Sequence, residues 1–159
     1  MSNTVAIRSD RGIHPVDRRQ AKKMAGRILH AVGVQDAELS LYFCSLRTIQ
    51  GLNSEWRGKD RPTDVLSFPQ DDNPDPACIS GPLGDIVIST DIAASQAERE
   101  GVSYEHEILR LLIHGVLHLL GYDHERGKTD AARMRREEKR IFKLMEDQSA
   151  GIVTPEKQN

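Results

Sequence analysis

Residues 114–124 read HGVLHLLGYDH and place three histidines within one short, leucine-rich segment that favours helix. His114 and His118 are four positions apart, so on an α-helix both side chains project from one face, about 5–6 Å apart at Cβ. That separation suits two ligands of one metal ion. Gly121 stands where a left-handed cap would end the helix and turn the chain back, which would bring His124 to the same ion.

The three imidazoles also indicate which metal to expect. Neutral imidazole nitrogen suits Zn²⁺ better than Mg²⁺ or Ca²⁺, which prefer oxygen ligands, while Ni²⁺ and Co²⁺ are possible substitutes. We therefore expect one Zn²⁺ per chain. Structural zinc sites usually have four protein ligands and are rich in cysteine, whereas three ligands leave one coordination position open. The pattern favours a catalytic metal site at the C-terminal end of a central helix.

The whole chain has the size and charge of one ordinary domain. Its 159 residues predict a single domain over 1–159, and its net charge of -2 excludes a generally basic nucleic-acid coat. A polyanionic ligand would therefore need a local cationic patch. Cys44 and Cys78 form no CxxC pair, and we expect two reduced thiols with no assigned role.

Two features of the sequence argue against export and against a membrane span. Charged residues near the N-terminus, such as Arg8 and Asp10, stand where a signal peptide would need an apolar run. The most apolar segment, 108–120, is too short for a membrane span and contains Arg110. We expect a cytoplasmic protein with no membrane partner.

Hydrophobic periodicity and turn residues predict alternating strands and helices. Strands are expected at 4–7, 38–44, 65–68 and 84–89, and helices at about 16–31, 46–56, 91–101, 103–120 and 129–147. A loop is expected at 70–82 and a loose tail at about 150–159. Because the first helix joins the first two strands, those strands should be a parallel pair with a right-handed crossover.

The histidine spacing also invites comparison with zinc peptidases. In the pattern H-E-x-x-H-x-x-G-x-x-H, the glutamate after the first histidine is the general base. This chain fits every fixed position except that one, which is Gly115. The ligand set therefore looks like that of a metzincin, and a zinc peptidase lacking the usual Glu base is a less favoured alternative.

Three blocks of the chain together resemble the YbeY endoribonucleases, also called rRNA maturation factors. Residues 114–124 match the family signature H-G-x-L-H-L-x-G-Y-D-H. Residues 52–69, LNSEWRGKDRPTDVLSFP, resemble its second block, and residues 83–88, LGDIVI, its third. The likeness spans nearly the whole chain in the same order.

That resemblance implies both a fold and an activity. The fold would be α+β, a single domain with a small mixed four-stranded sheet and about five helices. The metal would be held by His114, His118 and His124, and the family's functional arginine falls on Arg57. The implied activity is single-strand endoribonuclease action in 3′-end maturation of small-subunit (16S) rRNA and in ribosome quality control. The implied partners are single-stranded ribosomal RNA and the ribosome or a small-subunit ribosomal protein. DNA is not expected as a partner.

Cations near the metal would be needed to hold a phosphate. Arg57 offers a planar fork that matches phosphate oxygens, and we expect it to be the catalytic arginine as well as a substrate-binding residue. Lys59 and Arg61 extend a positive strip that could hold adjoining phosphates.

Carboxylates are expected beside the histidines as well. A metal-binding histidine usually donates its other ring N–H to a carboxylate or carbonyl. Asp85 and Asp123 are the main candidates for that role, and Glu107 and Glu125 are further ones. The positions of these carboxylates in the sequence do not show which of them contacts a histidine, or which of them acts as the general base.

A second alternative comes from a different functional class. The chain could be a non-catalytic, zinc-stabilised ribosome assembly factor, in which the metal only holds the C-terminal turn in place. Cleavage assays with metal-loaded protein would separate this alternative from a nuclease.

Overall fold

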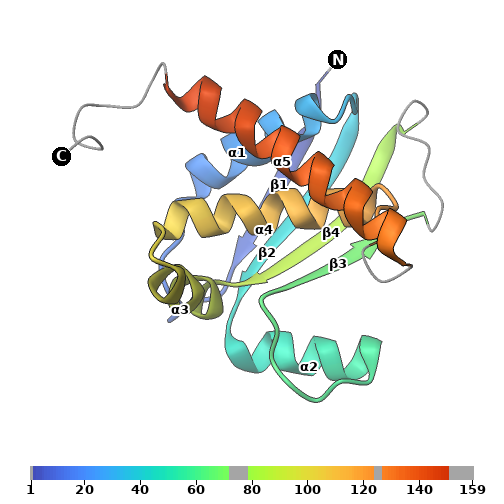
Figure 1. Cartoon of the computed structure of the whole chain (residues 1–159). Helices are drawn as coiled ribbons and strands as arrows, with labels where there is room; N and C mark the ends of the chain where they lie inside the picture. Colours follow the sequence, from blue (N-terminus) through green and yellow to red (C-terminus); the bar gives the residue numbers. More distant parts are fainter. Residues whose placement is uncertain (1, 72–78, 124–126, 151–159) are drawn as a thin grey trace.

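The structure is a computed structural model that describes residues 2–71, 79–123 and 127–150, with 147–150 as backbone only. The strands are β1 (Thr4–Ser9), β2 (Ala37–Cys44), β3 (Val65–Pro69) and β4 (Gly81–Ser89). The helices are α1 (Arg18–Ala31), α2 (Leu46–Arg57), α3 (Thr90–Glu100), α4 (Tyr104–Leu119) and α5 (Lys128–Ala150). Within the described residues, these elements confirm the expected α+β class with four strands and five helices (Figure 1).

The four strands form one mixed, open sheet in the order β1-β2-β4-β3. The pairs β1–β2 and β2–β4 are parallel, and β3 pairs with β4 in the antiparallel direction. The parallel first pair and the mixed sheet are as expected from the sequence. Strand β3 is an edge strand, so it pairs with a neighbouring strand, β4, on one side only.

Helix α4 lies at the centre of the helical layer, with α1 and α5 on the same side of the sheet and α2 on the other side (Figure 1). Its side chains Leu111, Leu112, Ile113, Val116 and Leu117 are almost completely buried. Burying each such side chain contributes roughly 1.5–3 kcal/mol, so the apolar circumference of α4 explains its central position. A smaller apolar cluster under α2 contains Ile49, Leu66 and Val87.

Gly115 allows α4 to lie directly on β4. A Cβ atom at this position would lie 2.9 Å from both Cδ1 and Cγ2 of Ile86, which is itself fully buried. Any larger side chain here would push the helix away from the sheet. Close packing of α4 on β4 therefore favours glycine at the position of the peptidase glutamate.

The element ends differ from the sequence-based expectations at a few places. Helix α1 begins at Arg18 because the Asp17 carboxylate caps it, accepting a hydrogen bond from the Gln20 N–H at 3.0 Å. Strand β4 begins at Gly81, inside the expected loop, and residues 72–78 of that loop lie outside the described part. Helix α5 continues to Ala150, and the expected tail from 151 onward also lies outside it.

Among the described residues, no helix combines the length and the hydropathy needed to cross a membrane.

Candidate metal centre

Helix α4 ends as the sequence predicts. Gly121 has φ 93°, the left-handed conformation that glycine adopts without strain. The N–H of Gly121 donates to the carbonyl of His118, and the N–H of Tyr122 donates to the carbonyl of Leu117, both at 3.0 Å. This pair of bonds satisfies two carbonyls of the last turn and reverses the chain. His124, the expected third ligand, lies outside the described residues.

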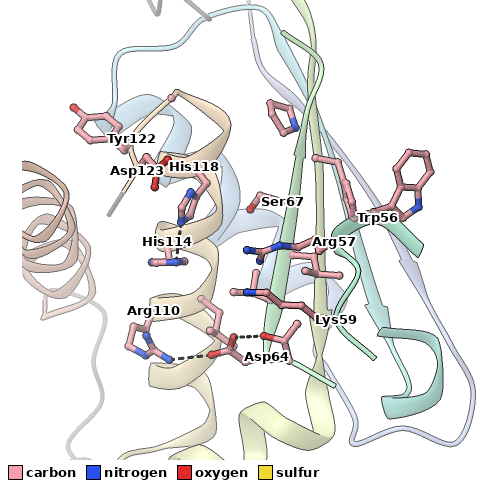
Figure 2. Close-up of a pocket in the computed structure, with 17 residues that line it drawn as sticks. Trp56, Arg57, Lys59, Asp64, Ser67, Arg110, His114, His118, Tyr122 and Asp123 are labelled. Atoms are coloured by element: carbon pink, nitrogen blue, oxygen red, sulfur yellow. Dashed lines mark hydrogen bonds and ion pairs between the residues drawn. The ribbon is translucent and has the colours of Figure 1, made fainter. Parts of the chain in front are cut away.

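The side chains of the other two histidines lie together on α4 and line one cleft (Figure 2). The Nε2 atoms of His114 and His118 lie 3.1 Å apart. Two nitrogens each about 2.0–2.1 Å from a tetrahedral zinc would be separated by roughly 3.3 Å, so this pair fits such an ion. Within residues 2–71, 79–123 and 127–150, no three His, Cys, Asp or Glu side chains form a metal-binding group. The fit therefore rests on these two imidazoles.

Glu138 makes a contact that the sequence motifs did not predict. From α5, its Oε2 atom lies 3.1 Å from Nδ1 of His114. The sequence did carry a signal, because Glu138 stands on the inward stripe of α5 between Met134 and Ile141, which are both buried. A carboxylate on an otherwise apolar helix stripe usually has a specific polar partner.

The Glu138 contact orients the imidazole of His114 for metal binding. A carboxylate only accepts hydrogen bonds, so the proton of this imidazole is held on Nδ1. The lone pair then lies on Nε2, the atom that faces His118. This carboxylate–histidine arrangement is the one that typically accompanies zinc ligands, and the donor set is suitable for Zn²⁺.

The two histidines open into a cleft of about 870 Å³ between α4 and the edge strand β3. Arg57, Lys59 and Asp123 also line it. Gly58 has φ 68° and ends α2 directly after Arg57, which places the arginine at the last turn. Figure 2 shows the side chains of Arg57 and Lys59 extending across β3 toward α4. The cleft therefore brings together two cations and two of the expected metal ligands.

Two sequence-predicted residues are not brought into the cleft. The exposed residue Arg61 does not line the cleft, and its carbonyl accepts a hydrogen bond from Asn53 Nδ2 at 2.9 Å.

Strand register decides the position of Asp85. Asp85 pairs with Phe68, whereas Ser67, the neighbour of Phe68 in β3, donates to the Gly115 carbonyl on α4. Since neighbouring residues of a strand point to opposite faces, Asp85 lies on the face away from α4. Its expected place beside the histidines is corrected accordingly.

Glu107 is held by an arginine one turn before His114 on α4. Arg110 donates to both carboxylate oxygens of Glu107, at 3.0 and 2.7 Å, and Gln96 donates to one of them at 2.6 Å. Burial raises the pKa of Glu107, but these hydrogen bonds and the arginine charge outweigh it and hold the pKa below its usual value. Arg110 also lies 3.6 Å from Asp64, and both residues line the cleft.

Of the remaining carboxylates proposed from the sequence, Asp123 lies in the cleft and Glu125 is outside the described residues. The structure thus places one of the two main candidates, Asp123, in the same cleft as the histidines, and adds Glu138.

The sequence and structure are similar to those of known proteins. The chain is 45% identical over 129 residues to a protein of Persephonella marina, covering 81% of this chain and 84% of that one. It is 42% identical over 156 residues to a protein of Geobacter sulfurreducens, covering 94% and 99% of the two chains. Both relatives are named Endoribonuclease YbeY.

A similar solved structure is the solution structure of TM1509 from Thermotoga maritima. It matches with a TM-score of 0.58 and 28% sequence identity over 86% of each chain. The family model described as Endoribonuclease YbeY matches residues 6–146, which include part of β1, all elements from α1 to α4, the cleft and Glu138. The chain therefore belongs to the YbeY endoribonuclease family.

Proposed function

We propose that this protein is a zinc-dependent endoribonuclease that cuts single-stranded RNA, and that it acts in 3′-end maturation of small-subunit (16S) rRNA. Family membership supports a hydrolase that acts on RNA. The observation that carries the proposal is the cleft in which Arg57 and Lys59 face His114 and His118. Cations that bind phosphate and imidazoles that bind metal are the two parts such a reaction needs.

Arg57, Lys59 and Glu138 have separate tasks in this reaction. Arg57 binds the non-bridging oxygens of the scissile phosphate with its planar fork and offsets the negative charge that develops there. Lys59 holds the same phosphate or an adjoining one. Glu138 keeps the His114 proton on Nδ1, so that Nε2 is a ligand. A bound Zn²⁺ would supply Lewis-acid stabilisation and a nucleophile at neutral pH.

The biological setting is a further part of the proposal. We infer a cytoplasmic protein that meets its rRNA on the ribosome, together with a small-subunit ribosomal protein, and that contributes to ribosome quality control. The net charge of -2 supports local recognition over general nucleic-acid binding, because the cleft must supply the attraction that the whole surface lacks.

The packing of Gly115 speaks against the peptidase alternative. Peptide hydrolysis at this type of site uses a glutamate at that position, where even an added Cβ atom would lie 2.9 Å from Ile86 and force a shift in the packing.

A cleavage comparison tests the proposal. Wild type, Arg57→Ala and His114→Ala are incubated with single-stranded rRNA fragments and with casein, before and after chelation and the return of Zn²⁺, Ni²⁺ or Co²⁺. We expect RNA cleavage by wild type only when metal is present, at least about 100-fold slower cleavage by either variant, and intact casein. Binding of RNA without any cleavage would favour the assembly factor, and cleavage of casein alone would favour a peptidase.

A further inference from the structure

Trp56 is the most exposed large apolar side chain of the described residues. Its exposed fraction is 65%, and it lines the same cleft as His114 and Arg57. It is also the only tryptophan in the chain. A single exposed apolar residue is common on protein surfaces, so its meaning depends on what surrounds it.

Trp56 lies at helical spacing from the two buried positions of α2. Ile49 and Asn53, seven and three residues earlier, are both buried, and Ile49 belongs to the same apolar cluster as Leu66 and Val87 of the sheet. Trp56 continues this series of positions toward the end of α2. There its ring meets Phe68 of β3, with centroids 6.1 Å apart and planes at 68°. An edge contact of this kind covers at most one face of the indole, so the other face is available to a ligand.

Two cations line the same cleft as this aromatic pair. Arg57 follows Trp56 in the chain, and Lys59 lies two residues further on, both lining the cleft. Figure 2 shows Trp56 on the side of β3 away from the histidines, with Arg57 between them. Proteins that hold single-stranded nucleic acid combine these same parts, which are cations along the backbone and aromatic faces on which bases stack.

We propose that Trp56 is a stacking platform for one unpaired nucleobase of the RNA strand whose phosphate Arg57 binds. The stacked nucleotide flanks the one that is cut, because the indole and the histidines lie on opposite sides of β3. In a duplex, each base face is covered by its neighbours, so only an unpaired strand can offer a base to this platform. The inference rests on the proposed function and adds a physical basis for its preference for single strands.

Fluorescence of the wild-type protein tests the stacking directly, since Trp56 is the only tryptophan. The probes are a short 2′-O-methyl oligouridylate and an abasic ribose-phosphate chain of equal length and charge. We expect saturable quenching by the oligouridylate and little change with the abasic chain. Equal responses to both probes, or binding of labelled oligouridylate without quenching, would overturn the inference while leaving the proposed function standing.

Substitutions provide the second measurement. Trp56→Leu retains an apolar side chain without an aromatic face, and Trp56→Phe retains the aromatic face. We expect Trp56→Leu to weaken oligouridylate binding by about 5- to 100-fold and Trp56→Phe to recover most of the affinity. The control is Leu46→Ala, at the exposed first residue of α2 and outside the cleft. Unchanged affinity of a folded Trp56→Leu variant would refute the stacking proposal but not the proposed function. Absence of both binding and cleavage in wild type would refute the proposed function as well.

Discussion

The Nδ1 atom of His114 on α4 lies 3.1 Å from the Oε2 atom of Glu138 on α5. The side chains are only 23% and 26% exposed, so water screens the contact partially. Glu138 is 24 residues further along the chain, and the contact therefore couples the docking of α5 to the orientation of an expected metal ligand. Because metal binds only the folded arrangement, it should in turn stabilise that docking.

Removal of this carboxylate should weaken metal binding. We expect Glu138→Ala to lower the affinity for Zn²⁺ or Co²⁺ by about 10- to 100-fold, and Glu138→Gln to have a smaller effect because its amide oxygen still accepts a hydrogen bond. Competition titration with a chelating dye measures this. The control is Glu137→Ala, since Glu137 pairs with Arg140 and not with His114. Equal metal affinity in all four proteins would show that Glu138 does not orient the ligand.

Lys59 and Arg61 should differ in their contribution to RNA binding, although both are exposed cations of the same loop. Lys59 lines the cleft and Arg61 does not. We expect Lys59→Ala to reduce the slope of log affinity against log salt by about 0.7, the value for one lost phosphate contact on a single strand. Arg61→Ala should leave the slope unchanged. Binding titrations at several salt concentrations measure both, and a larger effect at Arg61 would contradict the placement of the strand.

Gly115→Ala should destabilise the protein even though alanine is the better helix former. The new Cβ would lie 2.9 Å from atoms of the buried Ile86, and overpacking of this kind costs about 1–3 kcal/mol. Gly51→Ala is the matched control, because Gly51 is exposed on α2 and nothing lies within 4 Å of its added Cβ. There the helix propensity should raise stability by up to about 1 kcal/mol. Urea denaturation should therefore give shifts of opposite sign; a stabilising Gly115→Ala would mean that the helix moves at no cost.

The Glu107–Arg110 pair should make stability depend on pH in the acid range. The pKa of Glu107 is lowered in the folded state relative to its usual 4.5, so the folded state binds this proton less readily than the unfolded chain. The stabilisation is therefore complete above pH 4.5 and is lost as the pH falls through the lower, folded-state pKa. We expect Glu107→Gln to lower the free energy of unfolding by about 1–3 kcal/mol at neutral pH, with the difference shrinking as the solution is acidified. If the difference instead grew on acidification, the pKa of Glu107 in the folded state would be raised and not lowered.

Local sequence chemistry was enough to predict most of the elements of this fold. Ser45 and Ser103 cap α2 and α4 by accepting from the N–H three residues later, and Gly121 adopts the left-handed conformation that ends the metal helix. Such signals act over a few residues, so they can be recognised without knowing the tertiary structure. The spacing of His114 and His118 was informative for the same reason, since helix geometry alone puts them together.

Contacts between distant segments were decided only by the tertiary structure. Strand β3 lies at the edge of the sheet and forms one wall of the cleft. Arg57 and the two histidines line this cleft, whereas Arg61 does not. Strand register puts Asp85 on the other face, and the packing of α5 on α4 brings Glu138 to His114. The sequence determined which side chains were available for chemistry, because helix and turn periods are local. Which of them meet depends on how helices and strands pack, and packing is the sum of many weak contacts that no single motif encodes.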